Sequence, residues 1–130
     1  MIHSSDTICA LSTPSGSGAI GVIRLSGSKA VAIANSIFEG KNLEQQKGQT
    51  LHFGKITNGE EVIDEVLISL FKGPNSYTGE DTIEISCHGS SYILSKVLEL
   101  LLEKGANLAK PGEFTMRSFM NGKMDLAQAE

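Results

Sequence analysis

Five short runs of the chain are rich in apolar, often branched residues and are typical of β-strands, and the run at 20–26 also alternates between apolar and polar positions. The runs span residues 7–11, 20–26, 50–57, 62–71 and 82–87. Asn58-Gly59 separates the third run from the fourth and readily takes the positive φ angles of a tight turn, so these two runs are predicted to form a β-hairpin. The polar segments 41–47 and 72–81 are predicted to be loops.

Apolar residues at helical spacing predict helices between these strands. The clearest helix is capped by Ser90 or Ser91 and ends at Gly105. Five of its apolar residues share one face: Ile93, Leu94, Val97, Leu98 and Leu101. An earlier helix is expected to open after Gly27, to include Phe38 and to stop at Gly40.

The character of the sequence changes after the second helix. A turn at 110–112 precedes a predicted short helix over 113–120, and Asp125 is placed to cap a further helix that has barely begun where the chain stops. We therefore expect one domain over 1–121 and the start of a separate helical domain over 122–130. The order of elements predicts an α+β fold, a mostly antiparallel sheet of about five strands with helices packed on it.

The charge of the chain argues against nucleic-acid binding by this segment alone. The chain has 11 basic and 15 acidic residues, which gives a net charge of -4, whereas phosphate binding needs a clustered basic surface. The basic residues near the end are interspersed with acidic ones and indicate a mixed surface: Lys104, Lys110, Arg117 and Lys123. No apolar stretch is long enough for a signal peptide or a membrane span, so a cytoplasmic location is expected.

Few residues carry an evident chemistry. Cys9 and Cys87 lie far apart in strand-like runs and are expected to be small buried residues rather than metal ligands. Cys87 and His88 are neighbours in one strand and so point to opposite faces, which argues against a nucleophile–base pair. No catalytic set and no metal-ligand set is evident, and no G-x-x-x-x-G-K-[ST] motif occurs, so this segment lacks a P-loop.

A literal G-x-G-x-x-G pattern spans residues 16–21 and raises the question of dinucleotide binding. A dinucleotide-binding turn must open a helix whose N-terminus holds the pyrophosphate. Here residues 22–25 favour a strand, so a loop between two strands is the preferred interpretation.

Two mid-strand charges are candidates for ligand binding. Alternation in the run 82–88 places Glu84 on the polar face, where its carboxylate is either solvated or accepts two parallel hydrogen bonds from a planar ligand. Arg24 either extends to solvent or holds an anionic group. Lys123, after Gly122, has the pattern of an ordinary loop lysine.

Three stretches resemble the N-terminal domain of the MnmE/TrmE family of tRNA-modification GTPases. They are residues 6–27 with Thr13-Pro14 and Arg24, residues 73–89 with Tyr77-Thr78-Gly79-Glu80 and Glu84, and residues 110–130 with Gly112-Glu113-Phe114-Thr115 and Asn121-Gly122-Lys123. They follow the family's order across nearly the whole chain.

The resemblance implies a domain similar to the tetrahydrofolate-binding domain of aminomethyltransferases, which binds 5-formyltetrahydrofolate or a related one-carbon folate and forms a homodimer. Carried over by motif, the folate contacts are Arg24, Glu84 and Lys123, with Glu84 facing the pterin ring and the two cations facing a polar or anionic part of the ligand. The intact protein is expected to bind GTP with Mg and K ions in a separate domain. With the FAD-dependent partner MnmG/GidA it would install an aminomethyl-type (carboxymethylaminomethyl) group on the wobble uridine of tRNA.

Three alternatives stay open at this point. The chain could be a dimerisation module without a folate pocket, a fragment of a folate-dependent aminomethyltransferase, or a dinucleotide-dependent enzyme. The segment itself is expected to be non-catalytic, because GTP hydrolysis needs the P-loop that it lacks.

Overall fold

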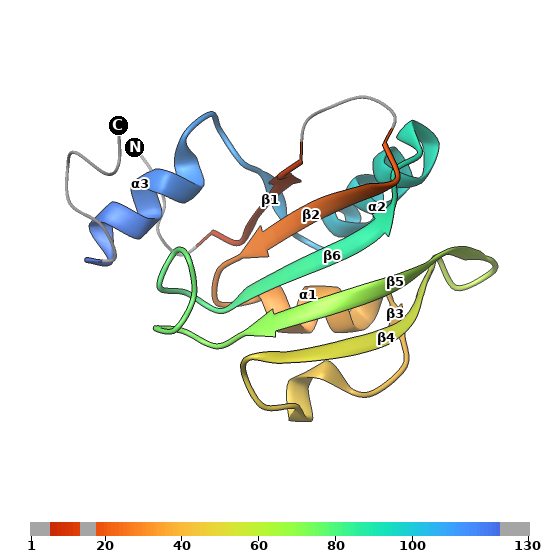
Figure 1. The fold of residues 1–130 in the computed structure, drawn as a ribbon, viewed down its shortest axis with the longest axis horizontal. Helices are drawn as coiled ribbons and strands as arrows, with labels where there is room; N and C mark the ends of the chain where they lie inside the picture. The colour runs from red at the N-terminus through yellow and green to blue at the C-terminus, as the bar shows by residue number, and fades with distance from the viewer. Residues whose placement is uncertain (1–5, 14–17, 123–130) are drawn as a thin grey trace.

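The computed structural model describes residues 6–13 and 18–122, which form one sheet with three α-helices (Figure 1). The elements follow in the order β1 (Ile8–Leu11), β2 (Ile20–Ser26), α1 (Ala30–Ser36), β3 (Phe38–Glu39), the 3-10 turn η1 (Leu43–Gln45), β4 (Thr50–Thr57), β5 (Val62–Phe71), β6 (Thr82–His88), α2 (Ser91–Glu103), β7 (Asn107–Leu108) and α3 (Glu113–Met120). The predicted α+β class is confirmed, and no helix among the described residues is long and apolar enough to span a membrane.

The sheet is larger than predicted. It has seven strands in the order β3-β4-β5-β6-β2-β1-β7, rather than about five. It is also mixed, because β7 pairs parallel with β1 while the other pairings are antiparallel. The two unpredicted strands, β3 and β7, have two residues each and lie at the two edges of the sheet. Two residues are too few to produce an alternating pattern, so the sequence could not reveal them.

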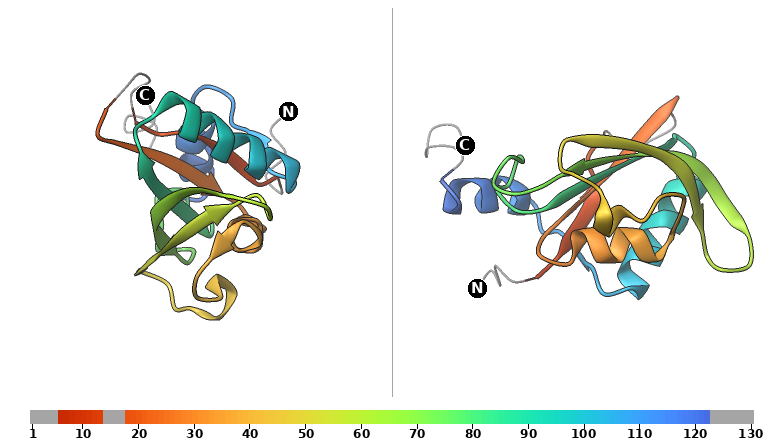
Figure 2. Two further views of the ribbon diagram at one scale, coloured as in Figure 1. Left: turned by 90° about the vertical axis from the view of Figure 1, so that its right-hand side faces the viewer. Right: turned by 90° about the horizontal axis from the view of Figure 1, so that it is seen from below.

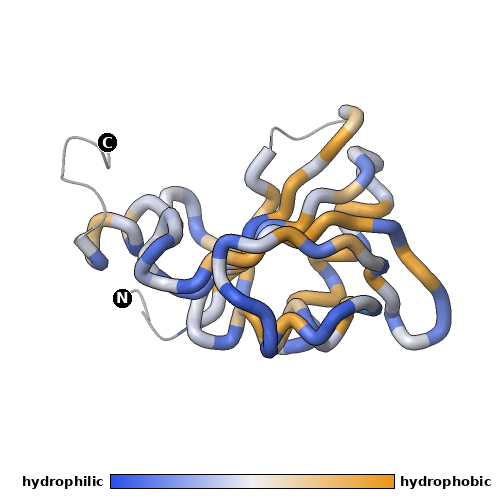
Figure 3. Tube along the Cα trace, turned by 60° about the horizontal axis from the view of Figure 1, so that its bottom comes forward, coloured by the Kyte–Doolittle hydropathy of each residue, from blue (hydrophilic) through white to orange (hydrophobic). Residues whose placement is uncertain are grey.

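The sheet has one covered face and one open face. Helices α1 and α2 lie on the same side of it (Figure 2), and the apolar residues of the central strands pack beneath them. The buried positions alternate along β6, where Ile83, Ile85 and Cys87 face the core as predicted. Figure 3 shows apolar segments running along the strands, whereas the connecting loops are mostly polar. The polar alternate positions of β2 and β6 therefore point away from the helices.

The first helix is shorter than expected. It ends at Ser36, and Phe38, predicted to be helical, pairs instead with Ile56 of β4. The ring of Phe38 packs over Gly54, where a Cβ atom would lie 2.5 Å from the ring. This tertiary packing overrides the helical periodicity. The segment 41–47 is also not simply a surface loop, because Leu43 is fully buried within it.

The hairpin of β4 and β5 is confirmed, but its turn is wider than predicted. Four residues, 58–61, connect the strands, and only Gly59 among them has a positive φ, of 97°. The side chain of Asn58 accepts hydrogen bonds from the backbone N–H groups of Glu60 and Glu61 at 2.9 Å. Asn58 thus stabilises the loop through its side chain instead of taking the left-handed conformation of a two-residue turn.

The second helix agrees closely with its prediction. Ser90 caps α2 by accepting a hydrogen bond from the backbone of Ile93, and Gly105 follows the helix with a φ of 111°. Leu94, Val97 and Leu101 are buried. The predicted helix 113–120 is likewise confirmed as α3. The predicted helix after Asp125 lies outside the described residues.

Candidate functional site

Arg24 and Glu84 form an ion pair on the open face, near the end of β2 and the start of β6. They stand directly opposite each other on the neighbouring strands β2 and β6, so their side chains share one face of the sheet. Nε and Nη2 of Arg24 each lie 3.0 Å from Oε2 of Glu84. The two side chains are 23% and 27% exposed, so the pair is accessible to a ligand without being fully solvated.

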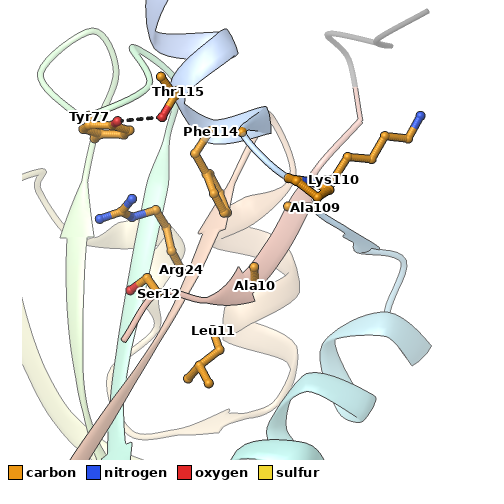
Figure 4. A pocket seen from close by; sticks show the side chains of 11 residues that line it. Ala10, Leu11, Ser12, Arg24, Tyr77, Ala109, Lys110, Phe114 and Thr115 are labelled. Atoms are coloured by element: carbon orange, nitrogen blue, oxygen red, sulfur yellow. Dashed lines mark hydrogen bonds between the residues drawn. The ribbon is translucent and has the colours of Figure 1, made fainter. Parts of the chain in front are cut away.

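Two aromatic rings flank the arginine. The guanidinium carbon of Arg24 lies 4.9 Å from the ring centre of Tyr77 and 5.5 Å from that of Phe114. Tyr77 comes from the loop 72–81 before β6, and Phe114 from the first turn of α3 (Figure 4). The Tyr77 hydroxyl and the Thr115 hydroxyl are 3.1 Å apart and form a hydrogen bond. The site is thus assembled from the sheet, one loop and α3.

Two cavities adjoin the ion pair, and Tyr77 lines both of them. The first, of about 390 Å³, is lined by Arg24 and Tyr77 together with residues of β1 and of the segment 109–115 (Figure 4). The second, of about 410 Å³, is lined by Glu84 and Tyr77 together with Gln49, Phe71, Asn75 and Thr82. Each volume lies within the usual range for small-molecule pockets. The arginine and the carboxylate therefore face different cavities while remaining in contact.

A second, buried charge cluster supports the same loop and helix. The side chain of Arg117, on α3, is only 2% exposed and lies 3.2 Å from carboxylate oxygens of both Glu80 and Glu113. The expectation that Arg117 belongs to a mixed surface is therefore wrong. Its partners lie on a loop and on its own helix, and charge counts along the chain do not reveal which carboxylates fold onto an arginine. The spacing of Glu113 and Arg117, four residues apart on a helix, was a usable signal.

The remaining sequence candidates have other roles. Cys9 and Cys87 are buried free thiols, as expected. Burial raises the pKa of the Cys9 thiol to about 11, and burial together with the nearby Asp64 charge raises the pKa of Cys87 to about 12. His88 does not contact Cys87 in a catalytic pair. Its Nδ1 atom lies 2.7 Å from Asp64, a partner that the sequence patterns had not indicated.

Two features of the sequence analysis, Lys123 and part of the glycine pattern, fall outside the described residues. Lys123 is outside the described residues, as is Gly16 of the glycine pattern. Gly21 of that pattern lies within β2, so a strand follows the glycines as expected, and the helix of a dinucleotide site is lacking. Within residues 6–13 and 18–122 no cluster of His, Cys, Asp or Glu could hold a metal ion.

The fold and the site together define the class of this protein: an α+β domain with a polar pocket on the open face of a mixed sheet. The family described as "GTP-binding protein TrmE N-terminus" matches residues 7–123, and the chain belongs to this family. The resemblance inferred from the three sequence stretches is therefore confirmed.

Curated relatives agree over nearly the whole chain. A protein of Flavobacterium psychrophilum is 62% identical over 128 residues, covering 96% of this chain and 28% of the relative. A protein of Bacteroides thetaiotaomicron is 61% identical over 129 residues, with the same coverage, and one of Streptococcus thermophilus is 51% identical over 125 residues, covering 96% of this chain and 27% of the relative. Each of these relatives is named tRNA modification GTPase MnmE. The chain thus spans little more than a quarter of their length.

Proposed function

We propose that this domain binds a reduced folate, 5-formyltetrahydrofolate or a related one-carbon derivative, as the N-terminal part of a tRNA-modification GTPase. The observation that carries the proposal is the Arg24–Glu84 pair, held beside aromatic rings and open to two cavities. A folate has a planar donor-bearing ring at one end and carboxylates at the other, so it suits a site that offers an acceptor, a cation and aromatic faces.

The proposed chemistry of binding is an exchange of hydrogen bonds. The pterin ring would present its ring N–H and amino group to the carboxylate of Glu84, a position that Arg24 partly occupies here. Arg24 would then turn toward a polar or anionic group of the ligand. Lys123, which follows α3 in the chain, is proposed as a second cation of the site. Because the ion pair is partly exposed, breaking it costs little compared with the bonds gained.

The homodimer is proposed on the same open face. Ile20, Phe53 and Leu51 are each more than 60% exposed there, and Phe53 stands opposite the partly exposed Leu67 in the strand register. Within this patch Leu51 lies in the same cross-strand row as the Arg24–Glu84 pair, through Ser69, whereas Phe53 and Leu67 lie in the next row, through Ser86. Large apolar residues gathered on one surface are typical of protein interfaces, which supports self-association through this face.

The intact protein is proposed to act in the cytoplasm on tRNA. GTP binding with Mg and K ions would belong to the part of the protein beyond this segment, and so would most contacts with MnmG/GidA and with the wobble uridine. The names of the relatives support this assignment and favour it over an aminomethyltransferase fragment. A dimerisation module without a folate pocket is the second candidate, favoured by the apolar patch.

Isothermal titration calorimetry of the folded domain with 5-formyltetrahydrofolate tests the folate proposal. We expect saturable binding by the wild type and at least about tenfold weaker binding by Glu84→Ala, since the carboxylate would lose charge-assisted hydrogen bonds. Glu60→Ala, in the exposed hairpin loop, is the matched control and should bind like the wild type. A folded wild type that shows no binding would refute the proposal and leave dimerisation as the supported role.

Sedimentation equilibrium tests the homodimer. Phe53→Asp places a charge in the apolar patch and should shift the wild-type dimer toward the monomer, because an unpaired carboxylate is costly to bury. Tyr92→Asp is the matched control, since Tyr92 is exposed to a similar degree, 63% against 71% for Phe53, but lies on α2. A monomeric wild type, or a Phe53→Asp dimer of unchanged affinity, would contradict dimerisation through this face.

A further inference from the structure

Helix α3 is attached to the domain in an unusual way. Its buried residues are Glu113, Arg117 and Ser118, all polar, whereas Met116, Phe119 and Met120 are between 37% and 57% exposed. The helix lies at one end of the molecule, apart from α1 and α2 (Figures 1 and 2). An isolated helix of eight residues is unstable in water. The position of α3 therefore depends on its polar contacts.

Arg117 is the centre of those contacts. Its Nη1 atom lies 3.2 Å from both carboxylate oxygens of Glu80 and also donates to the backbone carbonyl of Asp6, while Nη2 lies 3.2 Å from Oε2 of Glu113. Glu80 in turn accepts a hydrogen bond of 3.0 Å from the hydroxyl of Ser26 at the end of β2. One arginine thus connects α3, the loop before β6, the segment that precedes β1 and, through Glu80, the strand that carries Arg24.

Three further hydrogen bonds fasten α3 to the same loop. The Ser118 hydroxyl donates to the carbonyl of Tyr77 at 2.6 Å, and the Asn121 amide donates to the carbonyl of Thr78 at 2.8 Å. The Tyr77 hydroxyl meets that of Thr115 at 3.1 Å. These bonds join the two segments that carry the aromatic rings of the site, Tyr77 on the loop and Phe114 on α3.

We propose that Arg117 is a positioning residue for the pocket: by binding Glu80 and Glu113 it holds the loop and α3 together, so that Tyr77 and Phe114 stay on either side of Arg24. The proposal rests on the proposed folate function and assigns Arg117 no contact with the ligand. Its charge is buried and shared between two carboxylates, so a substitution leaves both carboxylates without their cation. The rings then lose their fixed places although the sheet beneath Arg24 is intact.

Two variants separate this role from a general loss of folding. Arg117→Met removes the charge at similar length. Arg117→Met combined with Glu80→Gln and Glu113→Gln also removes the two carboxylates that would lose their cation. If the single variant does not fold, this triple variant tests the positioning role. Lys96→Met is the matched control, because Lys96 pairs with Glu99 at an exposed site of α2. Arg117→Lys tests for partial rescue. It restores the positive charge, but one ammonium group cannot reproduce the forked hydrogen bonds of a guanidinium.

Amide hydrogen exchange and calorimetry with 5-formyltetrahydrofolate are the two measurements. In Arg117→Met we expect amide exchange to be at least about tenfold faster in residues 73–81 and 112–121 only. Folate binding should be about tenfold weaker, which corresponds to the loss of about one well-placed contact. Arg117→Lys should restore part of the binding. Unchanged exchange in those segments, or faster exchange spread evenly over the sheet, overturns the proposal, as does wild-type affinity in a folded variant. If the wild type binds no folate, the proposed function fails, and the exchange data alone decide whether Arg117 holds the two segments.

Discussion

Substitution of two neighbouring leucines on α2 tests how the covered face of the sheet is stabilised. Leu101 is fully buried in the core, whereas Leu102 is 41% exposed. Leu101→Ala removes three carbon atoms from the interior, a loss of about 2.4 kcal/mol at roughly 0.8 kcal/mol per buried CH₂ group. The cavity left behind adds to this loss, so we expect about 3–4 kcal/mol in total.

Leu102→Ala is the matched control, with the same change of residue in the same helix turn. Its side chain already meets water, and alanine favours the helix slightly, so we expect a loss of about 1 kcal/mol or less. Urea unfolding followed by far-UV circular dichroism measures both effects. With a slope of about 2 kcal/mol per molar urea, the midpoint should fall by roughly 1.5–2 M for Leu101→Ala and by about 0.5 M or less for Leu102→Ala.

The refuting result is a similar loss of stability for both variants. It would mean that α2 does not present Leu101 to the core, and the packing of the covered face would be wrong. Because α2 lies on the side of the sheet opposite the Arg24–Glu84 pair, any ligand binding by the folded fraction should be unchanged in both variants.

Three further predictions follow from single positions. Gly89→Ala places a Cβ atom 2.0 Å from the carbonyl oxygen of Gly18 and should lower stability by about 1–3 kcal/mol in thermal unfolding. Gly18→Ala, whose Cβ atom would meet only the carbonyl oxygen of Ile20 at 3.9 Å, should change stability by about 0.5 kcal/mol or less. Burial raises the pKa of Cys9 to about 11 and that of Cys87 to about 12, so labelling by iodoacetamide at pH 8 should be negligible until urea unfolds the chain. Because the unfolded thiols lose their protons near pH 9 while the folded thiols keep theirs, the free energy of unfolding should fall as the pH rises above 9. Ser90→Ala removes the cap of α2 and should cost about 1 kcal/mol in urea unfolding; no loss would contradict the capping bond.

The sequence predicted those elements whose own residues determine them. Strands β2, β4 and β5 have the predicted bounds because each is long enough to show its apolar pattern. The short strands β3 and β7 form only because neighbouring strands offer them partners, which a local pattern cannot show. Phe38 illustrates the difference, since its spacing fits a helix while its ring packs over Gly54 of a strand far along the chain.

The candidate site could be predicted only in part for a similar reason. Alternation placed Glu84 on a polar face, and the family resemblance associated it with Arg24, but nothing local indicated that β2 and β6 are neighbours. The aromatic rings were not predicted at all, because Tyr77 lies in a loop without periodicity and Phe114 is one apolar residue of a short helix. The site depends on long-range pairing, and Arg24 and Phe114, which are in contact, are 90 positions apart along the chain.

Burial separates the roles of the only two arginines in this chain. Arg24 and Glu84 are about one quarter exposed, so water reaches both charges when the pair opens, and in the proposed function a ligand replaces the arginine at the carboxylate. Arg117 is 2% exposed, and removing one member of a buried pair costs about 3–5 kcal/mol because a charge is stranded. The Arg24–Glu84 pair is therefore suited to exchange with a ligand. The buried pairs of Arg117 are suited to holding the loop 72–81 and α3 in place around it. Interchanging the environments would abolish both roles, since a buried Arg24 could not release Glu84 and an exposed Arg117 could not hold α3 in place.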